Sequence, residues 1–285
     1  MNAFTLMYHD VTGPGFDASG FPGGEAARYK LPVEQFEQHL AAIAGPRWRH
    51  PITIETLTDR RIEATRHRST PPVLLTFDDG GVSAAEYIAG ALEARGWRGH
   101  FFVTTAYIDR RGFLTRSQIQ TLRSRGHVVG SHTHTHPLRM GRCSEARQRD
   151  EWARSMTTLA DIIGEPIRVA SVPGGYCTEA VARTARDAGI QFLFTSEPTT
   201  RVESVDSLLV FGRYSVRCST AAATAAAIAN GSRLPWLRQS IAWRLKAVAK
   251  ATGGTVYDRG RAWILGRSPQ MTWGDEPDSV SEKTT

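Results

Sequence analysis

From residue 73 onward, the sequence alternates short apolar runs with longer amphipathic segments that end at glycine. Strand character appears at 73–77, 100–103, 128–131, 167–172 and 191–195, and the helical segments between these runs end at Gly96, Gly126, Gly164 and Gly189. Glycine commonly follows a helix because it adopts the left-handed conformation without a steric penalty. Such an alternation with short crossovers predicts parallel strands, in a (β/α) barrel or a doubly wound sheet. In a barrel, chemistry gathers at the C-terminal ends of the strands.

Four polar residues are placed to begin these helices. Ser83 with Glu86, and Thr115 with Gln118, have the three-residue spacing of a capping box, in which the two side chains bond reciprocally to main-chain N–H groups. Ser144 and Thr178 stand alone before helical segments and are predicted to act as simple N-caps.

The rest of the chain is less regular. Phe4–Tyr8 and Leu208–Val216 are predicted strands, Pro32–Ala44 and Trp236–Lys250 are predicted helices, and the Gly- and Pro-rich segment 12–29 is a predicted loop. We expect a single domain over 1–265. Within it we place core motifs at 70–215 and a C-terminal helical extension at 220–252, followed by a disordered polar tail at 266–285.

Charge and cysteine usage give weak constraints. The net charge is +7 and the sequence pI about 9.7, but the arginines are spread along the chain and no nucleic-acid-binding signature is present. The three cysteines form no CxxC pair, which is compatible with a reducing compartment. The N-terminal residues show neither the basic nor the long apolar part of a signal peptide, so we expect a cytoplasmic protein.

The predicted helix Trp236–Lys250 leaves open a contact with membranes. Trp236, Trp243, Lys246 and Lys250 share one side of it, and Trp with Lys is a combination found at lipid headgroups. We favour an ordinary exposed helix side and keep peripheral membrane contact as the alternative.

Two adjacent carboxylates, Asp78 and Asp79, follow the apolar run at 73–77 and precede Gly80. On its own, Asp-Asp-Gly is common turn chemistry. A buried strand that ends in paired acids is less ordinary, because two like charges side by side are costly unless a cation or a shared proton separates them.

A histidine cluster, Ser131-His-Thr-His-Thr-His-Pro137, follows another predicted strand. His132 and His136 have i,i+4 spacing, which on a helical turn directs both imidazoles the same way, whereas His134 points elsewhere. Two imidazoles and one carboxylate form a common catalytic Zn²⁺ set. A surface histidine cluster is the ordinary alternative, and the paired acids at a second strand end argue against it.

Together, TFDDG and the later H-T-x-x-H-P motif resemble the polysaccharide deacetylase family with NodB homology, over about residues 70–215. The resemblance implies a distorted (β/α) barrel of about seven strands and a metal-dependent amidase. It also implies Asp79, His132 and His136 as metal ligands and Asp78 as the catalytic base. The implied cofactor is a divalent metal, Zn²⁺ first, with Co²⁺ and Ni²⁺ as alternatives.

A third motif, Ser171-Val-Pro-Gly-Gly-Tyr176, departs from the family pattern Arg-x-Pro-aromatic-Gly. Ser171 stands in place of the arginine that orients the base, and Gly174 in place of the aromatic residue. We therefore expect Asp78 to be less constrained, while the Gly174 N–H stays available as an oxyanion donor. Arg213 could supply a compensating charge, although a surface arginine is the interpretation we favour. Pro173, Tyr176 and Arg213 are the predicted substrate-binding residues.

The family's general acid, a histidine near the C-terminal end, is missing, because no histidine follows His136. His9, in Leu6-Met-Tyr-His9, has the matching context at the end of the first predicted strand. This resembles the circularly permuted arrangement of poly-N-acetylglucosamine deacetylases, and His9 is the predicted acid for the leaving amine.

The function implied is removal of N-acetyl groups from an amino-sugar-containing glycan or glycan precursor, without nucleic-acid partners. Two alternatives stay open. One is deacetylation or deformylation of a lipid-linked or nucleotide-linked amino sugar. The other is a non-catalytic, metal-containing sugar-binding protein, which Ser171 and Gly174 favour and which Asp78 and His9 oppose.

Overall fold

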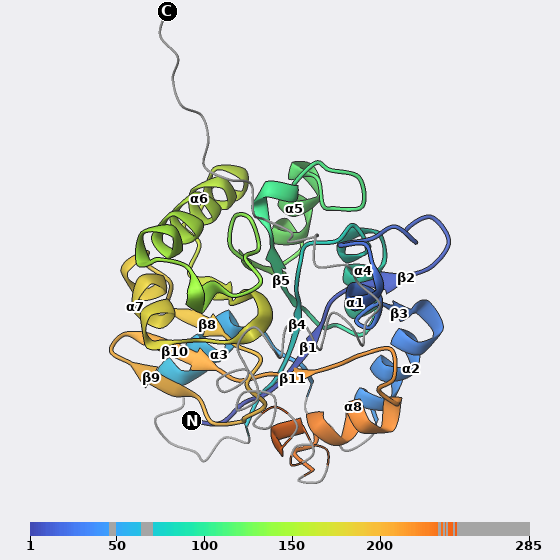
Figure 1. The fold of residues 1–285 in the computed structure, drawn as a ribbon. Coiled ribbons are helices and arrows are strands. Elements are labelled where there is room, and N and C mark those ends of the chain that lie inside the picture. Colours follow the sequence, from blue (N-terminus) through green and yellow to red (C-terminus); the bar gives the residue numbers. More distant parts are fainter. Residues whose placement is uncertain are drawn as a thin grey trace, which may run out of the picture.

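The body of the protein is one nine-stranded sheet. The computed structural model describes residues 1–45, 50–63, 71–232, 235, 237, 239–241 and 243. The strand order is β11-β1-β4-β5-β6-β7-β8-β10-β9, and every neighbouring pair is parallel except β9 with β10 (Figure 1). The strands are β1 (Phe4–Tyr8), β4 (Val73–Phe77), β5 (His100–Val103), β6 (Val128–Ser131), β7 (Val169–Ser171), β8 (Phe192–Phe194), β9 (Glu203–Val205), β10 (Leu208–Phe211) and β11 (Tyr214–Ser215). The predicted α/β barrel-type fold is confirmed, with nine strands where about seven were expected.

Helices surround the strands (Figure 1). They are α1 (Gly24–Ala27), α2 (Val33–Ile43), α3 (Ile54–Glu63), α4 (Ala89–Glu93), α5 (Arg116–Ser124), α6 (Glu145–Ile163), α7 (Glu179–Asp187) and α8 (Ala222–Ala229). A separate pair of short strands, β2 (Val11–Thr12) and β3 (Leu31–Pro32), brackets the N-terminal loop, which is largely irregular as predicted.

A link of two residues joins the edge strand β11 to β10, which is next to the opposite edge of the sheet. The predicted single strand 208–216 is in fact β10 and β11, separated by Gly212 and Arg213. β10 pairs with β8 near one end of the strand order, whereas β11 pairs with β1 at the other end. So short a link requires the two ends to approach each other, and it holds Arg213 where they meet.

The side chains of β4 alternate between the two faces of the sheet, as the period of two in a strand requires. Val73, Leu75 and Phe77 belong to the core cluster shared with the surrounding helices, whereas Leu74 packs in a separate cluster with residues such as Phe102. The same alternation places Thr76 and then Asp78 on the face of Leu74. Thr76 there accepts a hydrogen bond from Arg213 Nη1 at 3.3 Å.

Three of the four predicted helix caps are confirmed. Thr115 and Gln118 form the reciprocal capping box of α5, and the hydroxyls of Ser144 and Thr178 accept N–H bonds at the starts of α6 and α7. The Ser83 prediction is wrong. Its hydroxyl instead donates to Asp10 Oδ1 at 2.8 Å, and the helix there begins with a π-helical turn, Ala84–Ile88.

The C-terminal part is described only to residue 243. The predicted alanine-rich helix is present as α8, and the described residues from 235 to 243 are helical. Leu237 and Ile241 are 48% and 51% exposed there. Trp236, Lys246, Lys250 and the tail 266–285 lie outside the described residues. Within the described part of the chain, no helix combines the length and apolar character needed to cross a bilayer.

Candidate active site

Asp78 and Asp79 are neighbours in sequence but point to different partners. Both lie directly after β4, and the main-chain N–H of Asp78 still bonds to Tyr8 O at 3.1 Å. Asp79 then adopts φ 77°, a left-handed conformation that is uncommon outside glycine and that aspartate tolerates. The chain therefore turns between the two residues, and this turn separates their carboxylates.

The histidine segment after β6 is an irregular turn, so the predicted helical turn is wrong. Thr133 and His136 both have positive φ, 63° and 62°. The imidazoles of His132 and His136 nevertheless converge, with ring centroids 4.9 Å apart. His134 points away, as predicted, and its Nδ1 meets Thr105 Oγ1 at 2.8 Å.

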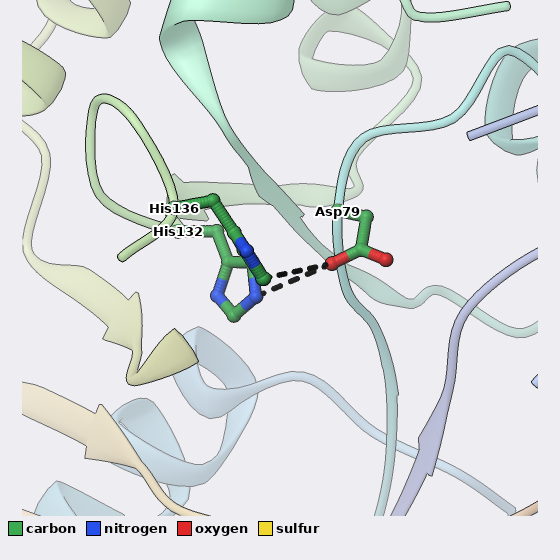
Figure 2. A group of neighbouring side chains, drawn as sticks. All are labelled: Asp79, His132 and His136. Carbon is green, nitrogen blue, oxygen red and sulfur yellow. Dashed lines mark ion pairs between the residues drawn. The ribbon is translucent and has the colours of Figure 1, made fainter. Parts of the chain in front are cut away.

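Asp79, His132 and His136 form a compact group. The Nε2 atoms of His132 and His136 lie 3.4 and 3.5 Å from the same oxygen, Asp79 Oδ1, and Figure 2 shows both rings turned to that carboxylate. One ligand atom from each residue lies within 4.8 Å of the others. Ligands held at about 2.0–2.1 Å around a tetrahedral Zn²⁺ are separated by roughly 3.3 Å. The donor set and its spacing therefore fit a divalent cation, and the group is a possible metal site.

The surroundings of Asp79 and His136 disfavour proton binding to both side chains. Burial alone would raise the pKa of Asp79, but its hydrogen bond to His132 and the nearby histidine charges hold that pKa well below its usual range. Burial lowers the pKa of His136 to about 4, only partly opposed by Asp79. At neutral pH the site therefore presents an ionised carboxylate and an imidazole with a free lone pair.

Asp78 is held by Arg213, which corrects two expectations. The guanidinium is fully buried, not on the surface, and bonds in parallel to the two carboxylate oxygens, Nη1 to Oδ1 at 2.6 Å and Nη2 to Oδ2 at 2.8 Å. Burial would raise the pKa of Asp78, but the charge and hydrogen bonds of Arg213, together with the charges of His132 and His9, outweigh burial and lower that pKa. Asp78 is thus firmly constrained. Arg213 is removed from the set of substrate-contacting residues, because its side chain has no exposed surface.

Ser171, which stands where the family pattern has arginine, also contacts this carboxylate. Its hydroxyl donates to Asp78 Oδ1 at 3.3 Å and lies 2.6 Å from His132 Nδ1. Asp78 stays oriented with a serine at position 171, because Arg213, which directly precedes β11, supplies the paired guanidinium.

The third motif forms a short 3-10 turn, Pro173–Gly175, after β7. Gly174 is exposed and has φ 65°, and a Cβ at this position would lie 2.6 Å from Leu138 O. This steric limit explains why no aromatic side chain stands there. Pro173 is buried, and the Tyr176 ring stacks on Trp243 with centroids 5.2 Å apart. Substrate contact by Pro173 and Tyr176, and the oxyanion role of the Gly174 N–H, stay predictions.

His9 follows β1 and lies near both carboxylates, since its charge lowers the pKa of Asp78 and of Asp79. Its ring packs against Tyr29 with centroids 4.5 Å apart. Its Nδ1 is buried and has no hydrogen-bond partner among the described residues. The structure thus brings His9 to the predicted site, while its role as the acid stays a prediction.

One supporting residue, Glu151 of α6, was not found from the sequence. Its buried carboxylate accepts the main-chain N–H groups of His134 and Thr135 at 2.9 and 2.8 Å, and also the Thr135 hydroxyl. It thereby fixes the turn that carries the two metal-facing histidines. Glu151 lies among charged residues of an amphipathic helix, so its sequence context gives no sign of burial.

Comparison with known proteins agrees with this geometry. Residues 65–193 match the family model described as polysaccharide deacetylase. The Bacillus subtilis protein YxkH, named as a polysaccharide deacetylase, is 25% identical over 197 residues, which cover 68% of this chain and 64% of YxkH. The match thus spans slightly less than two thirds of that relative.

Solved structures share the fold. A polysaccharide deacetylase from Bacillus cereus superposes with a TM-score of 0.65 at 20% identity, covering 80% of this chain and 69% of its own. IcaB from Ammonifex degensii superposes with a TM-score of 0.64 at 24% identity, and the match covers 80% of this chain and 97% of the IcaB chain. The Streptococcus pyogenes deacetylase PplD superposes with a TM-score of 0.60 at 18% identity, and the match covers 78% of this chain and 95% of the PplD chain.

The parallel sheet carries the Asp–His–His group, a possible metal site, beyond the C-terminal ends of β4 and β6. The segment that matches the polysaccharide deacetylase model, residues 65–193, holds Asp78, Asp79, His132 and His136.

Proposed function

We propose that this protein is a metal-dependent hydrolase that removes N-acetyl groups from an amino-sugar-containing glycan. The observation that carries the proposal is the different surroundings of two adjacent carboxylates. Asp79 faces the imidazoles of His132 and His136, whereas Asp78 is paired with Arg213 beside them. A cation site next to a separately held carboxylate is the arrangement that amide hydrolysis by water requires.

The residues divide the work of the reaction. Asp79, His132 and His136 would hold a divalent cation, which would supply Lewis-acid polarisation of the acetamide carbonyl and make water more acidic. Asp78, ionised at neutral pH, takes the proton of the attacking water. The Gly174 N–H donates to the developing oxyanion, and His9 gives a proton to the departing amine. Zn²⁺ is the metal we expect first, because two imidazoles and a carboxylate are typical of its catalytic sites.

An N-acetylated polysaccharide is the substrate class we propose, because the segment that carries the site matches the polysaccharide deacetylase family. The products are acetate and a free amino sugar. Exposed Gly174 and partly exposed Tyr176 lie on the turn after β7 and are the proposed contacts for the sugar.

The test is acetate release from N-acetylglucosamine oligosaccharides, before and after chelation and again after Zn²⁺ is restored. Activity that persists after complete metal removal would exclude the proposal. Asp78→Asn and Asp79→Asn then separate the two roles. We expect both variants to lose turnover, but only Asp79→Asn to lose bound metal, which is measured by elemental analysis.

Asp161→Asn, which removes an exposed carboxylate from α6, serves as the control and retains both properties. Loss of metal in Asp78→Asn together with its retention in Asp79→Asn would mean that the two roles are reversed. A protein that binds Zn²⁺ but hydrolyses none of the acetylated sugars would fit the sugar-binding alternative.

A further inference from the structure

The hydroxyl of Ser171 connects a proposed metal ligand to the proposed base. His132 turns its Nε2 to Asp79, so this nitrogen must keep its lone pair if it is to bind a cation. The proton of the neutral ring is then on Nδ1, which lies 2.6 Å from Ser171 Oγ and 3.1 Å from Ser171 O. The Nδ1–H group therefore donates to Ser171, and this fixes both the tautomer and the ring orientation.

The hydroxyl proton of Ser171 is left to donate in the other direction. Ser171 Oγ lies 3.3 Å from Asp78 Oδ1 and is the donor of that bond. A directed chain results, from His132 Nδ1–H to Ser171 Oγ–H to Asp78 Oδ1. All three side chains are buried, so water does not compete for these bonds.

The two oxygens of Asp78 are consequently unequal. Oδ1 accepts from Arg213 Nη1 and from Ser171, which uses both of its lone pairs. Oδ2 accepts only from Arg213 Nη2 among the described residues, and it is also the oxygen that lies 4.0 Å from His132 Nε2, toward the possible metal site. The one free lone pair of the carboxylate thus belongs to the oxygen on the metal side.

We infer that Ser171 is a positioning residue that selects Asp78 Oδ2 as the proton-accepting atom and holds His132 in its metal-binding tautomer. The Asp78 part of this inference rests on the proposed function, whereas the His132 part rests on metal binding alone. It assigns a purpose to the residue that replaces the family's arginine.

The first measurement is metal affinity, by titration of the apo-protein with Zn²⁺ against a chromophoric chelator. Removal of a group that supports a metal ligand typically weakens affinity 10–100-fold. For Ser171→Ala we expect Zn²⁺ affinity to weaken about tenfold, the lower end of that range. The main-chain carbonyl of residue 171 remains as an acceptor for the Nδ1–H of His132. Thr184→Val is the matched control. It removes another fully buried hydroxyl, bonded to Gln148 Oε1 at 3.1 Å, that contacts none of the site residues.

The second measurement is kcat per bound metal, at saturating Zn²⁺, with KM determined in parallel. We expect Ser171→Ala to lower kcat at least tenfold while KM changes less than twofold, because the hydroxyl acts on the base and not on the sugar. A merely structural serine would reduce stability and the loaded fraction, but not kcat per bound metal.

The two measurements can fail separately. Zn²⁺ affinity of Ser171→Ala equal to that of Thr184→Val would overturn the His132 part, and an unchanged kcat per bound metal would overturn the Asp78 part. If the wild-type protein releases no acetate from any acetylated sugar, the proposed function fails and the Asp78 part fails with it. The affinity comparison then still decides the His132 part.

Discussion

Arg213 and Asp78 meet through two parallel N–H···O bonds of 2.6 and 2.8 Å, in a position where the guanidinium has no exposed surface. Arg213 Nε also donates to Thr195 O at 2.8 Å, and the guanidinium lies over the Phe102 ring at 5.7 Å. Planar, two-pronged pairing of this kind is specific to arginine, because a lysine ammonium cannot match both oxygens with fixed geometry. The orientation of Asp78 thus depends on a residue 135 positions later in the chain.

Arg213→Ala should strongly destabilise the protein. Breaking a buried ion pair leaves an uncompensated charge and costs about 3–5 kcal/mol, and we expect a loss of that size in urea unfolding. Arg213→Lys should retain more stability but lose most of kcat, because the carboxylate is no longer held at both oxygens. Arg149→Ala, which breaks an exposed pair with Glu145, is the control and should change stability by less than about 0.5 kcal/mol. Equal stability of the Arg213 and Arg149 alanine variants would contradict this account.

Glu151→Gln should loosen the turn that carries His132 and His136. The carboxylate accepts three hydrogen bonds there, and an amide has only one oxygen with which to accept them. Leaving a buried donor without a partner costs about 1–3 kcal/mol. We therefore expect a loss of unfolding free energy in that range, together with weaker Zn²⁺ binding by competition titration. A variant with lower stability but wild-type Zn²⁺ affinity would show that Glu151 supports the fold and not the site.

Gly174→Ala tests whether the turn after β7 is sterically limited. The positive φ costs a non-glycine residue about 1–2 kcal/mol, and the new Cβ would also meet Leu138 O at 2.6 Å. Gly164→Ala is a matched control, since Gly164 has φ 77° with nothing within 4 Å of an added Cβ. We expect both variants to lose stability by calorimetry, but only Gly174→Ala to lose acetate-releasing activity. Full activity in Gly174→Ala would remove the case for an oxyanion donor at this turn.

Acid should destabilise the protein through His100, a buried histidine on β5. Its Nε2 accepts the Ile54 N–H and its Nδ1 donates to Leu75 O, both at 2.9 Å, and burial lowers its pKa to about 4. The unfolded chain, with a His pKa of about 6.5, binds the proton more readily. Stability from this group is therefore complete above about pH 6.5 and is lost as pH falls toward about 4.

The size of the His100 effect follows from the same linkage. Between pH 7 and pH 4.5 it amounts to about 2 kcal/mol. His100→Gln can keep one donor and one acceptor without titrating. With a chelator present to remove metal, its unfolding free energy should therefore fall between pH 7 and pH 4.5 by about 2 kcal/mol less than that of the wild-type protein. If the unfolding free energies of the wild-type protein and His100→Gln fall equally with pH, His100 is excluded as the source of this acid destabilisation.

Local patterns in the sequence predicted most of the site, and contacts between distant segments account for what was missed. Asp79 and His132 stand within two residues of strand ends and His136 follows in the same turn as His132, so the chain alternation brings them to one edge of a parallel sheet. Arg213 was assigned to the surface because its partner lies far away in sequence and most arginines are exposed.

The errors in the helix starts have the same origin. Ser83 has the spacing of a cap, yet its hydroxyl bonds to Asp10, a buried carboxylate with no local signature. Thr115 has no such competing partner and caps α5 as predicted. Two strands were missed. β9 (Glu203–Val205) was not predicted, and β10 and β11 were predicted as one strand, because the break at Gly212-Arg213 depends on the curvature of the whole sheet.

Arg213, on the two-residue link between β10 and β11, lies outside the segment that matches the family model. Residues 65–193 suffice for the family match, yet they contain neither Arg213 nor His9. A fragment limited to that segment would carry both carboxylates and both metal-facing histidines, but Asp78 would have no countercharge. During synthesis, likewise, every metal-facing residue is in place before the ribosome has made residue 213. Asp78 is paired with Arg213 only when the last strands dock beside the first, so the proposed hydrolysis would depend on the completed sheet.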